Sequence, residues 1–497
     1  MAASTAGERD RLTVAILALG GQGGGVLADW ILALAEAEGY VAQGTSVPGV
    51  AQRTGSTIYY IEMVRRGAPG ANHPAPVLAM TPTPGDVDVV IASELMETGR
   101  AILRGFVSAD RTTLIGSTHR IYAISEKSAL GDGTGAGERI LDAAARRSRR
   151  FVGFDMEAAA AEAGSVISSV MFGALAGAGA LPFARESFEA AIRRGGKAVS
   201  ANLAGFAAGM AAAGERRTAI EAAAAPPAAT TPAGAERQAR VLSTLPAAAH
   251  ASALEGVRRL MDYQDAAYAD LYLDRLAPIA ARGEPVLSEA VARHLALWMS
   301  YEDTIRVADL KVRAARSARV ASEVRVGATQ LLTVTEYMHP RLREVCETLP
   351  ARLGAAIWHR PALRRRLEPF FSRGRHVRVT RLRWFLLLRT VAAMRRIRRS
   401  TWRFAEEQAR IEEWLALVAA TAATDVALAT EIAATQELIK GYSDTFERGL
   451  RHFTLVSEAA RRLTGRTDAA AQVRALRAAA LADEDGDALA AALATAA

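Results

Sequence analysis

The sequence predicts an α/β N-terminal domain with a doubly wound, mostly parallel sheet, followed by a mainly α-helical C-terminal domain. Three observations support this prediction. The chain opens with a buried strand, a glycine-rich turn and a helix; its pattern becomes helical after Asp142; and a stretch rich in Ala, Pro and Thr divides it. A length of 497 residues suits two or three domains.

The N-terminal domain is predicted over residues 1–215. Its first strand is the apolar run 13–19 (TVAILAL), and the helical pattern 26–38 follows with its large apolar residues on one face. Further strands are expected at 40–47, 56–64, 87–92, 112–116 and 120–124. Helices are expected at 157–164, 168–178, 185–194 and 197–213.

The second half of the chain has a different pattern. Residues 216–240 are rich in Ala, Pro and Thr and lack apolar anchors, so they are predicted to be a linker. Residues 241–497 show helical stretches with Arg and Glu on the polar face and almost no alternating strand pattern. We therefore expect a second, mainly helical domain over 241–497.

The glycine cluster 20–25 (GGQGGG) lies between the first strand and the first helix, where free backbone amides and the helix dipole favour an anion. A dinucleotide fingerprint fits poorly, because Val26 stands where the third glycine should be and no acidic residue ends the second strand. Two other interpretations stay open: a tight turn that needs small residues for packing, and a turn that brings the backbone close to a ligand or partner subunit.

The loop 45–56 (TSVPGVAQRTGS) follows the second strand, at the sheet edge where ligands of open α/β sheets bind. Its Arg53 is suited to a carboxylate or phosphate, although it could equally be a surface residue. We expect the cleft to be lined by residues from the turn and from this loop: Gly21, Gln22, Gly23, Gly24, Ser46, Gly49, Gln52, Arg53 and Ser56.

The positive charge is local. The whole chain carries +8, whereas residues 360–403 hold fifteen arginines against one acid, Glu368, so the remainder is net negative. Aromatic residues alternate with these arginines. Three interpretations are open: a solvated helix face, a docking surface for an acidic protein or the phosphates of coenzyme A, and an Arg-rich nucleic-acid-binding module.

Other polar residues give weaker signals. The eight histidines show no metal-ligand spacing, and the single cysteine, Cys346, cannot ligate an iron–sulfur cluster. No catalytic residue is identified, and no metal site is expected. Residues 261–265 (MDYQD) with Tyr268 and Tyr272 fall partly on one helical face, which favours a buried polar network or subunit contact over catalysis. The polar N-terminus has no apolar signal core, so a cytoplasmic protein without a membrane segment is expected.

Several motifs in order resemble a known family. The GGQGGG turn, the TSVPGVAQRTGS loop and the segments SVISSVMFGALAGAGALPF and KAVSANLAGFAAG resemble the gamma-type domain of thiamine-dependent 2-oxoacid:ferredoxin oxidoreductases, and most of all the beta subunit of indolepyruvate oxidoreductases. The MDYQD motif and residues 441–445 (GYSDT) resemble the helical region appended there. Asn202 matches the family pattern and is expected to line the cleft, whereas Ser168 replaces an Asn that is frequent in related domains.

The resemblance implies a division of labour between subunits. This chain would bind no cofactor alone and would not be catalytic alone; a partner alpha subunit would carry thiamine diphosphate with Mg²⁺ and 4Fe-4S clusters. An aromatic 2-oxoacid, such as indolepyruvate or another arylpyruvate, would be oxidatively decarboxylated to arylacetyl-CoA or arylacetate. Electrons would pass to ferredoxin or another acceptor. Coenzyme A is a candidate ligand at the subunit interface, and this chain would complete the cleft.

Overall fold

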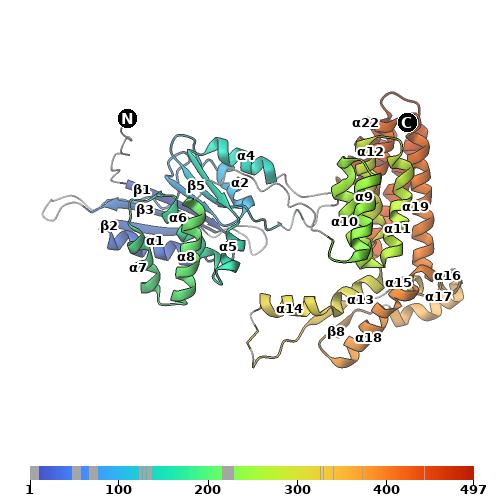
Figure 1. Ribbon diagram of the computed structural model, residues 1–497, viewed down its shortest axis with the longest axis horizontal. Helices are drawn as coiled ribbons and strands as arrows, with labels where there is room; N and C mark the ends of the chain where they lie inside the picture. The colour runs from blue at the N-terminus through green and yellow to red at the C-terminus, as the bar shows by residue number, and fades with distance from the viewer. Residues whose placement is uncertain are drawn as a thin grey trace. The chain divides into compact units, whose positions relative to one another are not determined.

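The computed structural model consists of two compact units, Met1–Ala223 and Ala224–Ala497, which are described separately (Figure 1). The structure describes residues 11–47, 57–66, 76–122, 126, 130, 137–214, 229–324, 326–327, 329–339, 341–371, 373–441 and 443–496.

The first unit is built on a six-stranded sheet with the order β2-β3-β1-β4-β5-β6. The strands β1, β4, β5 and β6 run parallel, whereas β3 runs antiparallel to both of its neighbours, β1 and β2. The strand bounds are β1 Arg11–Ala18, β2 Tyr40–Val47, β3 Thr57–Arg65, β4 Val89–Ala92, β5 Thr113–Ser117 and β6 Arg150–Phe154.

Helices cover both faces of the sheet (Figure 1). Alternate residues of β1 point to opposite faces, so that Val14 and Ile16 enter one core and Ala15 and Leu17 enter the other. The first core is closed by α1 (Gly24–Ala37), α5 (Met156–Glu162), α6 (Ile167–Gly177), α7 (Arg185–Gly195) and α8 (Val199–Gly214). The second is closed by α2 (Leu95–Leu103) and α4 (Gly137–Arg147). The predicted doubly wound, mostly parallel sheet is confirmed.

The helices α6 and α8 are in direct backbone contact. A Cβ placed on Gly177 would lie 2.4 Å from the carbonyl oxygen of Met210, and one on Gly209 would lie 2.1 Å from the carbonyl oxygen of Val170. Each helix carries two glycines four residues apart, Gly173 and Gly177 on α6 and Gly205 and Gly209 on α8. The small residues of the two sequence segments 165–183 and 197–209 therefore serve helix packing.

Charged groups join the strands at the edge of the sheet where β1 and β4 begin. Arg111 donates to Asp88 at 2.9 Å, and Asp88 accepts hydrogen bonds from the backbone N–H (3.0 Å) and hydroxyl (2.9 Å) of Thr13. Burial opposes the ionisation of Asp88, but the donors Arg111 and Thr13 outweigh it and lower its pKa. Arg11 bridges Glu62 and Asp86 beside this cluster.

The second unit is mainly helical. Its largest core joins residues of α9 (Pro232–Thr244), α10 (Ala247–Tyr263), α11 (Ala266–Ala280), α12 (Pro285–Met299), α19 (Trp402–Thr421), α20 (Val426–Ala434), η3 (Thr435–Leu438), α21 (Ser443–Leu463), α22 (Ala469–Ala480) and α23 (Asp487–Ala496). The remaining elements are α13 (Thr304–Val312), α14 (Ala314–Glu323), α15 (Leu342–Thr348), α16 (Ala351–Trp358), α17 (Pro361–Leu367), η1 (Glu368–Phe371), α18 (Leu382–Ala393), η2 (Met394–Ser400) and the hairpin of β7 (Thr335–Met338) with β8 (Arg375–Arg378). The predicted mainly helical C-terminal region is confirmed.

Three local predictions were wrong. The segment predicted as a strand at 120–124 is not a strand over its described residues, Arg120 to Tyr122. The strand β6 lies instead in a region predicted as helical; as an edge strand it has only two buried residues, Val152 and Phe154, and so gives little periodic signal. Finally, α9 begins inside the segment predicted as a linker, because Thr231 caps it and Pro232 occupies its first turn.

Within the described ranges, no single helix is long and apolar enough to cross a membrane. Only when α5 and α6 are taken together do they have the length and apolar composition of a membrane-spanning segment. The two helices are bent by 111° at the break between them.

Candidate functional site

The glycine turn at the end of β1 is shaped by backbone conformation and by close packing. Gly21 and Gly23 have φ angles of 89° and 71°, which glycine adopts without strain. A Cβ on Gly23 would lie 2.8 Å from Oγ of Ser168, and one on Gly24 would lie 2.7 Å from Cβ of Ala18. Packing therefore accounts for Gly23 and Gly24, whereas nothing lies within 4 Å of a Cβ at Gly21.

The same turn gives the start of α1 no side-chain cap. Gly23 is the N-cap residue of α1 and offers no side chain to the first amides of the helix. The N-cap of α6, Val166, likewise makes no side-chain cap hydrogen bond, and Ser168 in the first turn of α6 faces Gly23. Amides at a helix start that no side chain caps can bind a carboxylate or phosphate oxygen.

Gln22 closes the turn against the neighbouring strands. Its Oε1 accepts hydrogen bonds from the backbone N–H of Leu19 (3.2 Å) and from the hydroxyl of Ser93, the residue that follows β4. Because Oε1 is an acceptor in both contacts, the amide nitrogen Nε2 faces Nε2 of His119 at 3.4 Å. The side chain of Gln22, which was predicted to line the cleft, thus forms hydrogen bonds within the first unit.

His119 continues this polar cluster from the end of β5. Its Nδ1 lies 2.6 Å from the hydroxyl of Ser117, which also accepts a hydrogen bond from the backbone N–H of Met156 at 3.0 Å. Gln22 and Ser117 thus each contact one of the two ring nitrogens of His119. Gln22, Ser93, Ser117 and His119 therefore form one connected cluster at the carboxyl ends of β1, β4 and β5.

Glu94 borders the cluster and is held by backbone donors. Its carboxylate accepts hydrogen bonds from the N–H groups of Met96 (2.9 Å) and Glu97 (2.7 Å), which caps α2. Burial raises the pKa of Glu94, and these backbone hydrogen bonds reduce that effect. Glu94 is therefore a helix cap whose charge lies beside the polar cluster.

The other predicted site residues lie in three places. Gly49, Gln52, Arg53 and Ser56 fall outside the described residues. Ser46 is exposed on β2 and pairs with Tyr59 of β3, whose ring lies next to Gly24 and Gly25. Asn202 is buried, and its side-chain amide donates to the carbonyl oxygen of Lys197 at 2.9 Å. The amide of Asn202 thus braces the connection between α7 and α8, where Ala198 has a φ angle of 45°.

Ser93, Glu94, Ser117 and His119 were missed by the sequence analysis. A signal for them was present, because Ser93 and Glu94 directly follow the buried run of β4, Ser117 ends β5 and His119 lies two residues beyond it. Ligands of open α/β sheets gather at the carboxyl ends of parallel strands, and these residues stand at two such ends.

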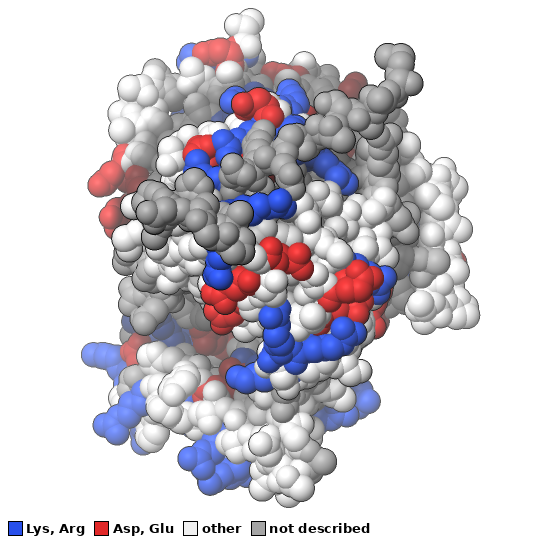
Figure 2. Space-filling model, turned by 90° about the vertical axis from the view of Figure 1, so that its left-hand side faces the viewer, with Lys and Arg blue, Asp and Glu red and all other residues white. Residues whose placement is uncertain are grey.

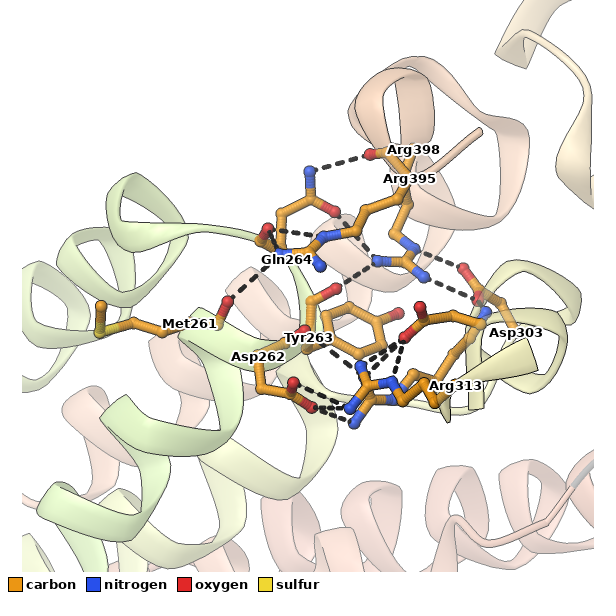
Figure 3. A network of polar contacts seen from close by, with 10 residues as sticks. Met261, Asp262, Tyr263, Gln264, Asp303, Arg313, Arg395 and Arg398 are labelled. Carbon is orange, nitrogen blue, oxygen red and sulfur yellow. Dashed lines mark hydrogen bonds and ion pairs between the residues drawn. The ribbon is translucent and has the colours of Figure 1, made fainter. Parts of the chain in front are cut away.

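The second unit contains a polar network that joins the MDYQD motif to the arginine-rich segment (Figure 3). Arg398 is buried, donates to both carboxylate oxygens of Asp303 (2.8 and 3.2 Å) and to the carbonyl oxygen of Tyr263 (2.7 Å), and lies 4.1 Å from the centre of the Tyr263 ring. Arg395 donates to the carbonyl oxygen of Gln264 at 2.8 Å. These arginines therefore bind carbonyl groups at the end of α10.

The acidic residue of the motif is paired as well. Asp262 accepts from Arg306 at 2.7 Å and from Arg313 at 3.0 Å. Burial opposes its ionisation, but the two guanidinium groups outweigh it and lower its pKa. These contacts confirm the predicted polar network around residues 261–265.

No three His, Cys, Asp or Glu side chains among the described residues are arranged to hold a metal ion. The nucleic-acid interpretation of the arginine-rich segment gains no support. Arginines of the segment already lie over two tryptophan rings: Arg364 lies 5.2 Å from the ring centre of Trp358, which precedes the segment, and Arg383 lies 5.3 Å from that of Trp384 within it. Those faces are thus covered where a base would stack.

Comparison with known proteins finds a similar family for part of each unit. Residues 13–212, in the first unit, match the family model described as "Pyruvate ferredoxin/flavodoxin oxidoreductase". Residues 249–459, in the second unit, match a second model, described as "Family of unknown function (DUF6537)". The two matches lie on either side of the boundary between the two units.

Solved structures similar to this chain come from proteins with related descriptions. They include a 2-oxoglutarate:ferredoxin oxidoreductase from Magnetococcus marinus, the pyruvate oxidoreductase subunit PORC from Thermotoga maritima and a keto/oxoacid ferredoxin oxidoreductase gamma subunit from Geobacter sulfurreducens. Each is 16% identical and covers 41% of this chain, with TM-scores of 0.29, 0.29 and 0.27. The matched regions span 31%, 97% and 96% of those chains, so this chain spans about a third of the first. No curated protein gives a significant match.

Proposed function

We propose that the chain is the non-thiamine, non-cluster subunit of a 2-oxoacid:ferredoxin oxidoreductase, acting on an aromatic 2-oxoacid such as indolepyruvate. The match of residues 13–212 to the pyruvate ferredoxin/flavodoxin oxidoreductase domain carries the proposal. The single cysteine supports the division of labour, because one thiolate cannot ligate a 4Fe-4S cluster. The aromatic preference rests on the sequence resemblance to indolepyruvate oxidoreductases.

In this proposal, thiamine diphosphate bound by the partner supplies the carbanion chemistry of oxidative decarboxylation. The first unit contributes the edge of the cleft. The amides at the start of α1 would receive a carboxylate of the 2-oxoacid or a phosphate of coenzyme A, because the Gly23 N-cap leaves them without a side-chain acceptor. The cluster of Gln22, Ser93, Ser117 and His119 would hold the turn in this open conformation.

Reconstitution with the partner tests this function. The chain and the cluster-bearing subunit are co-expressed, and dye reduction is followed with indolepyruvate, phenylpyruvate, pyruvate and 2-oxoglutarate, with and without coenzyme A. We expect a stable complex whose turnover with an aryl acid requires this chain. Full turnover by the partner alone would refute the subunit role, whereas a preference for pyruvate or 2-oxoglutarate would refute only the aromatic assignment.

The loop 45–56 gives a sharper test of the cleft. If Arg53 binds the substrate carboxylate or a coenzyme A phosphate, Arg53→Ala should raise the apparent KM by about tenfold or more while complex assembly is unchanged. Arg66→Ala, which removes a described arginine beyond the end of β3, is the matched control. Unchanged kinetics in Arg53→Ala would refute this binding role and favour the alternative interpretation of Arg53 as a surface residue.

A further inference from the structure

One segment of the second unit, from β8 through α18 to η2, carries exposed arginines and exposed apolar side chains together. We call it the α18 surface, and define it by Arg378, Arg381, Leu382, Phe385, Leu386, Arg389, Arg396 and Ile397. Its large apolar residues are strongly exposed, with Leu382 at 72% and Leu386 at 52% of their full accessible area. In Figure 2, blue Lys and Arg side chains are more prominent than red Asp and Glu side chains along the lower edge of the view.

The helix α18 has two apolar sides, and only one of them is covered. Leu388 and Ala392 are buried against Ala308 and Val312 of α13. Leu382, Leu386 and Arg389 are spaced by four and three residues, so they share a second side of the helix, about 100° around the axis from the side of Leu388 and Ala392. The packing that folds this region therefore leaves a second apolar stripe of α18 unpartnered.

Four arginines of this surface are not paired with acidic side chains of the described residues. In the part of the chain that the structure describes, Arg378, Arg381, Arg389 and Arg396 form no ion pair with a carboxylate. Their neighbours in sequence differ, because Arg398 pairs with Asp303 and Arg399 with Asp265. Acidic residues of the same unit thus neutralise part of the positive charge of residues 360–403. The rest of that charge stays unpaired on the α18 surface.

The way in which charge and apolar area are mixed distinguishes the kinds of partner. A helix that lies on a membrane separates its basic residues from its apolar face, whereas Arg389 shares one stripe with Leu382 and Leu386. A phosphate-binding surface relies on cationic and hydrogen-bond-donating groups, and exposed leucines contribute neither. Arginine interspersed with large apolar side chains is typical of protein–protein interfaces.

We propose that the α18 surface is a permanent interface for an acidic, partly apolar face of the cluster-bearing partner subunit. The charge requires carboxylates on the other side, and the exposed apolar residues favour a partner that stays bound over one that docks transiently. This proposal rests on the proposed function for the existence of that partner. It adds that the second unit, and not the oxidoreductase-type domain alone, holds the complex together.

Two double variants test the interface in the full chain. The first, Arg378→Glu with Arg389→Glu, reverses charge on the surface; the second, Leu382→Ser with Leu386→Ser, removes its apolar stripe. Arg451→Glu and Leu242→Ser are matched controls in the same unit, since Arg451 is exposed and Leu242 is 51% exposed. The affinity of each purified chain for the purified partner subunit is measured at low and moderate salt by interferometry.

We expect each double variant to weaken the affinity by about tenfold or more, the charge variant most at low salt, while both controls stay within about twofold of wild type. A wild-type complex that oxidises the 2-oxoacid, together with unchanged affinity in both double variants, would overturn the interface and leave the proposed function standing. Absence of any complex or activity with the wild-type chain would overturn both.

The same proteins are mixed with anionic phosphatidylserine vesicles and with a single-stranded oligonucleotide. We expect neither probe to bind at moderate salt. If either binds as tightly as the partner subunit and the Arg378→Glu, Arg389→Glu variant abolishes that binding, the surface recognises phosphates and the protein interface is refuted.

Discussion

Gly173 of α6 lies against the backbone of Phe206 in α8 so closely that a Cβ on Gly173 would come within 2.0 Å of the Phe206 carbonyl oxygen. The obstacle is backbone and not a side chain that could rotate away. The two helices can approach this far only because glycine stands at this contact.

Substitution of Gly173 should therefore separate the helices. We expect Gly173→Val to lower the unfolding free energy of the first unit by about 3 kcal/mol or more, since a side chain here must displace a backbone segment. Gly214→Ala is the matched control, because nothing lies within 4 Å of a Cβ at the end of α8. Denaturant unfolding followed by circular dichroism measures both variants, and equal stability would contradict the packing argument.

Gln22 should behave as a structural residue of the turn. Gln22→Ala removes the acceptor for the Leu19 N–H and for the Ser93 hydroxyl, so we expect a loss of about 1–3 kcal/mol in the unfolding free energy. Gln43→Ala removes only an exposed contact to the carbonyl oxygen of Ala79 and should change stability by about 0.5 kcal/mol or less. If Gln22→Ala unfolds like wild type, the hydrogen bonds to the turn contribute nothing.

Two neighbouring arginines should differ strongly in their effect on the second unit. The Arg398 side chain is 1% exposed and its loss would leave the Asp303 carboxylate buried without its cationic partner, so Arg398→Ala should cost about 3–5 kcal/mol. The Arg399 side chain is 44% exposed in its pair with Asp265, and Arg399→Ala should cost about 1 kcal/mol or less. Thermal unfolding of the two variants provides the comparison, and similar melting temperatures would contradict a buried network.

The stability of the second unit should fall as the pH is lowered through the usual range of histidine. His294 is buried and its Nδ1 lies 3.1 Å from Oε1 of Gln436; burial lowers its pKa, followed by the influence of nearby Arg293 and Arg477, against the opposing effect of Gln436. The unfolded chain binds a proton at His294 near pH 6.5 and the folded chain does so only at lower pH. Stability from this group is therefore complete well above pH 6.5 and is lost below it.

A histidine substitution isolates that effect. Between pH 8 and pH 5.5, the unfolding free energy should decline less steeply in His294→Gln than in wild type. His250→Gln, in which another histidine of the same unit is replaced, is the control for the loss of a histidine as such. Identical slopes for all three proteins, measured by urea unfolding, would show that His294 does not titrate with folding.

Much of the first unit could be predicted from its sequence because its central strands are buried on both faces. The apolar run that became β1 and the glycines that follow it are local signals, and the structure has both. The edge strand β6 lacked that signal. The use of Gln22 by the fold could not be foreseen either, since its partner Ser93 lies 71 residues away.

In the second unit, the sequence indicated the polar motif and the arginine-rich segment separately, but not the contacts between them. Residues 261–265 were expected to form a polar network, and the arginine-rich segment was expected to face solvent or a partner. The structure joins them across about 130 positions, as in the contact from Arg398 to the carbonyl oxygen of Tyr263. A residue such as Arg398 can be assigned to a core only when its distant acceptors are known.

That connection has a consequence for hydrogen exchange. The carbonyl groups at the end of α10 are bound by Arg395 and Arg398 of η2, so neither segment can open without leaving buried polar groups of the other unpaired. Amides in the last turn of α10 and in η2 should therefore exchange with solvent at a common rate, as one cooperative unit. The helix that carries the α18 surface is continuous with η2, and it is thereby anchored to the largest core of its unit.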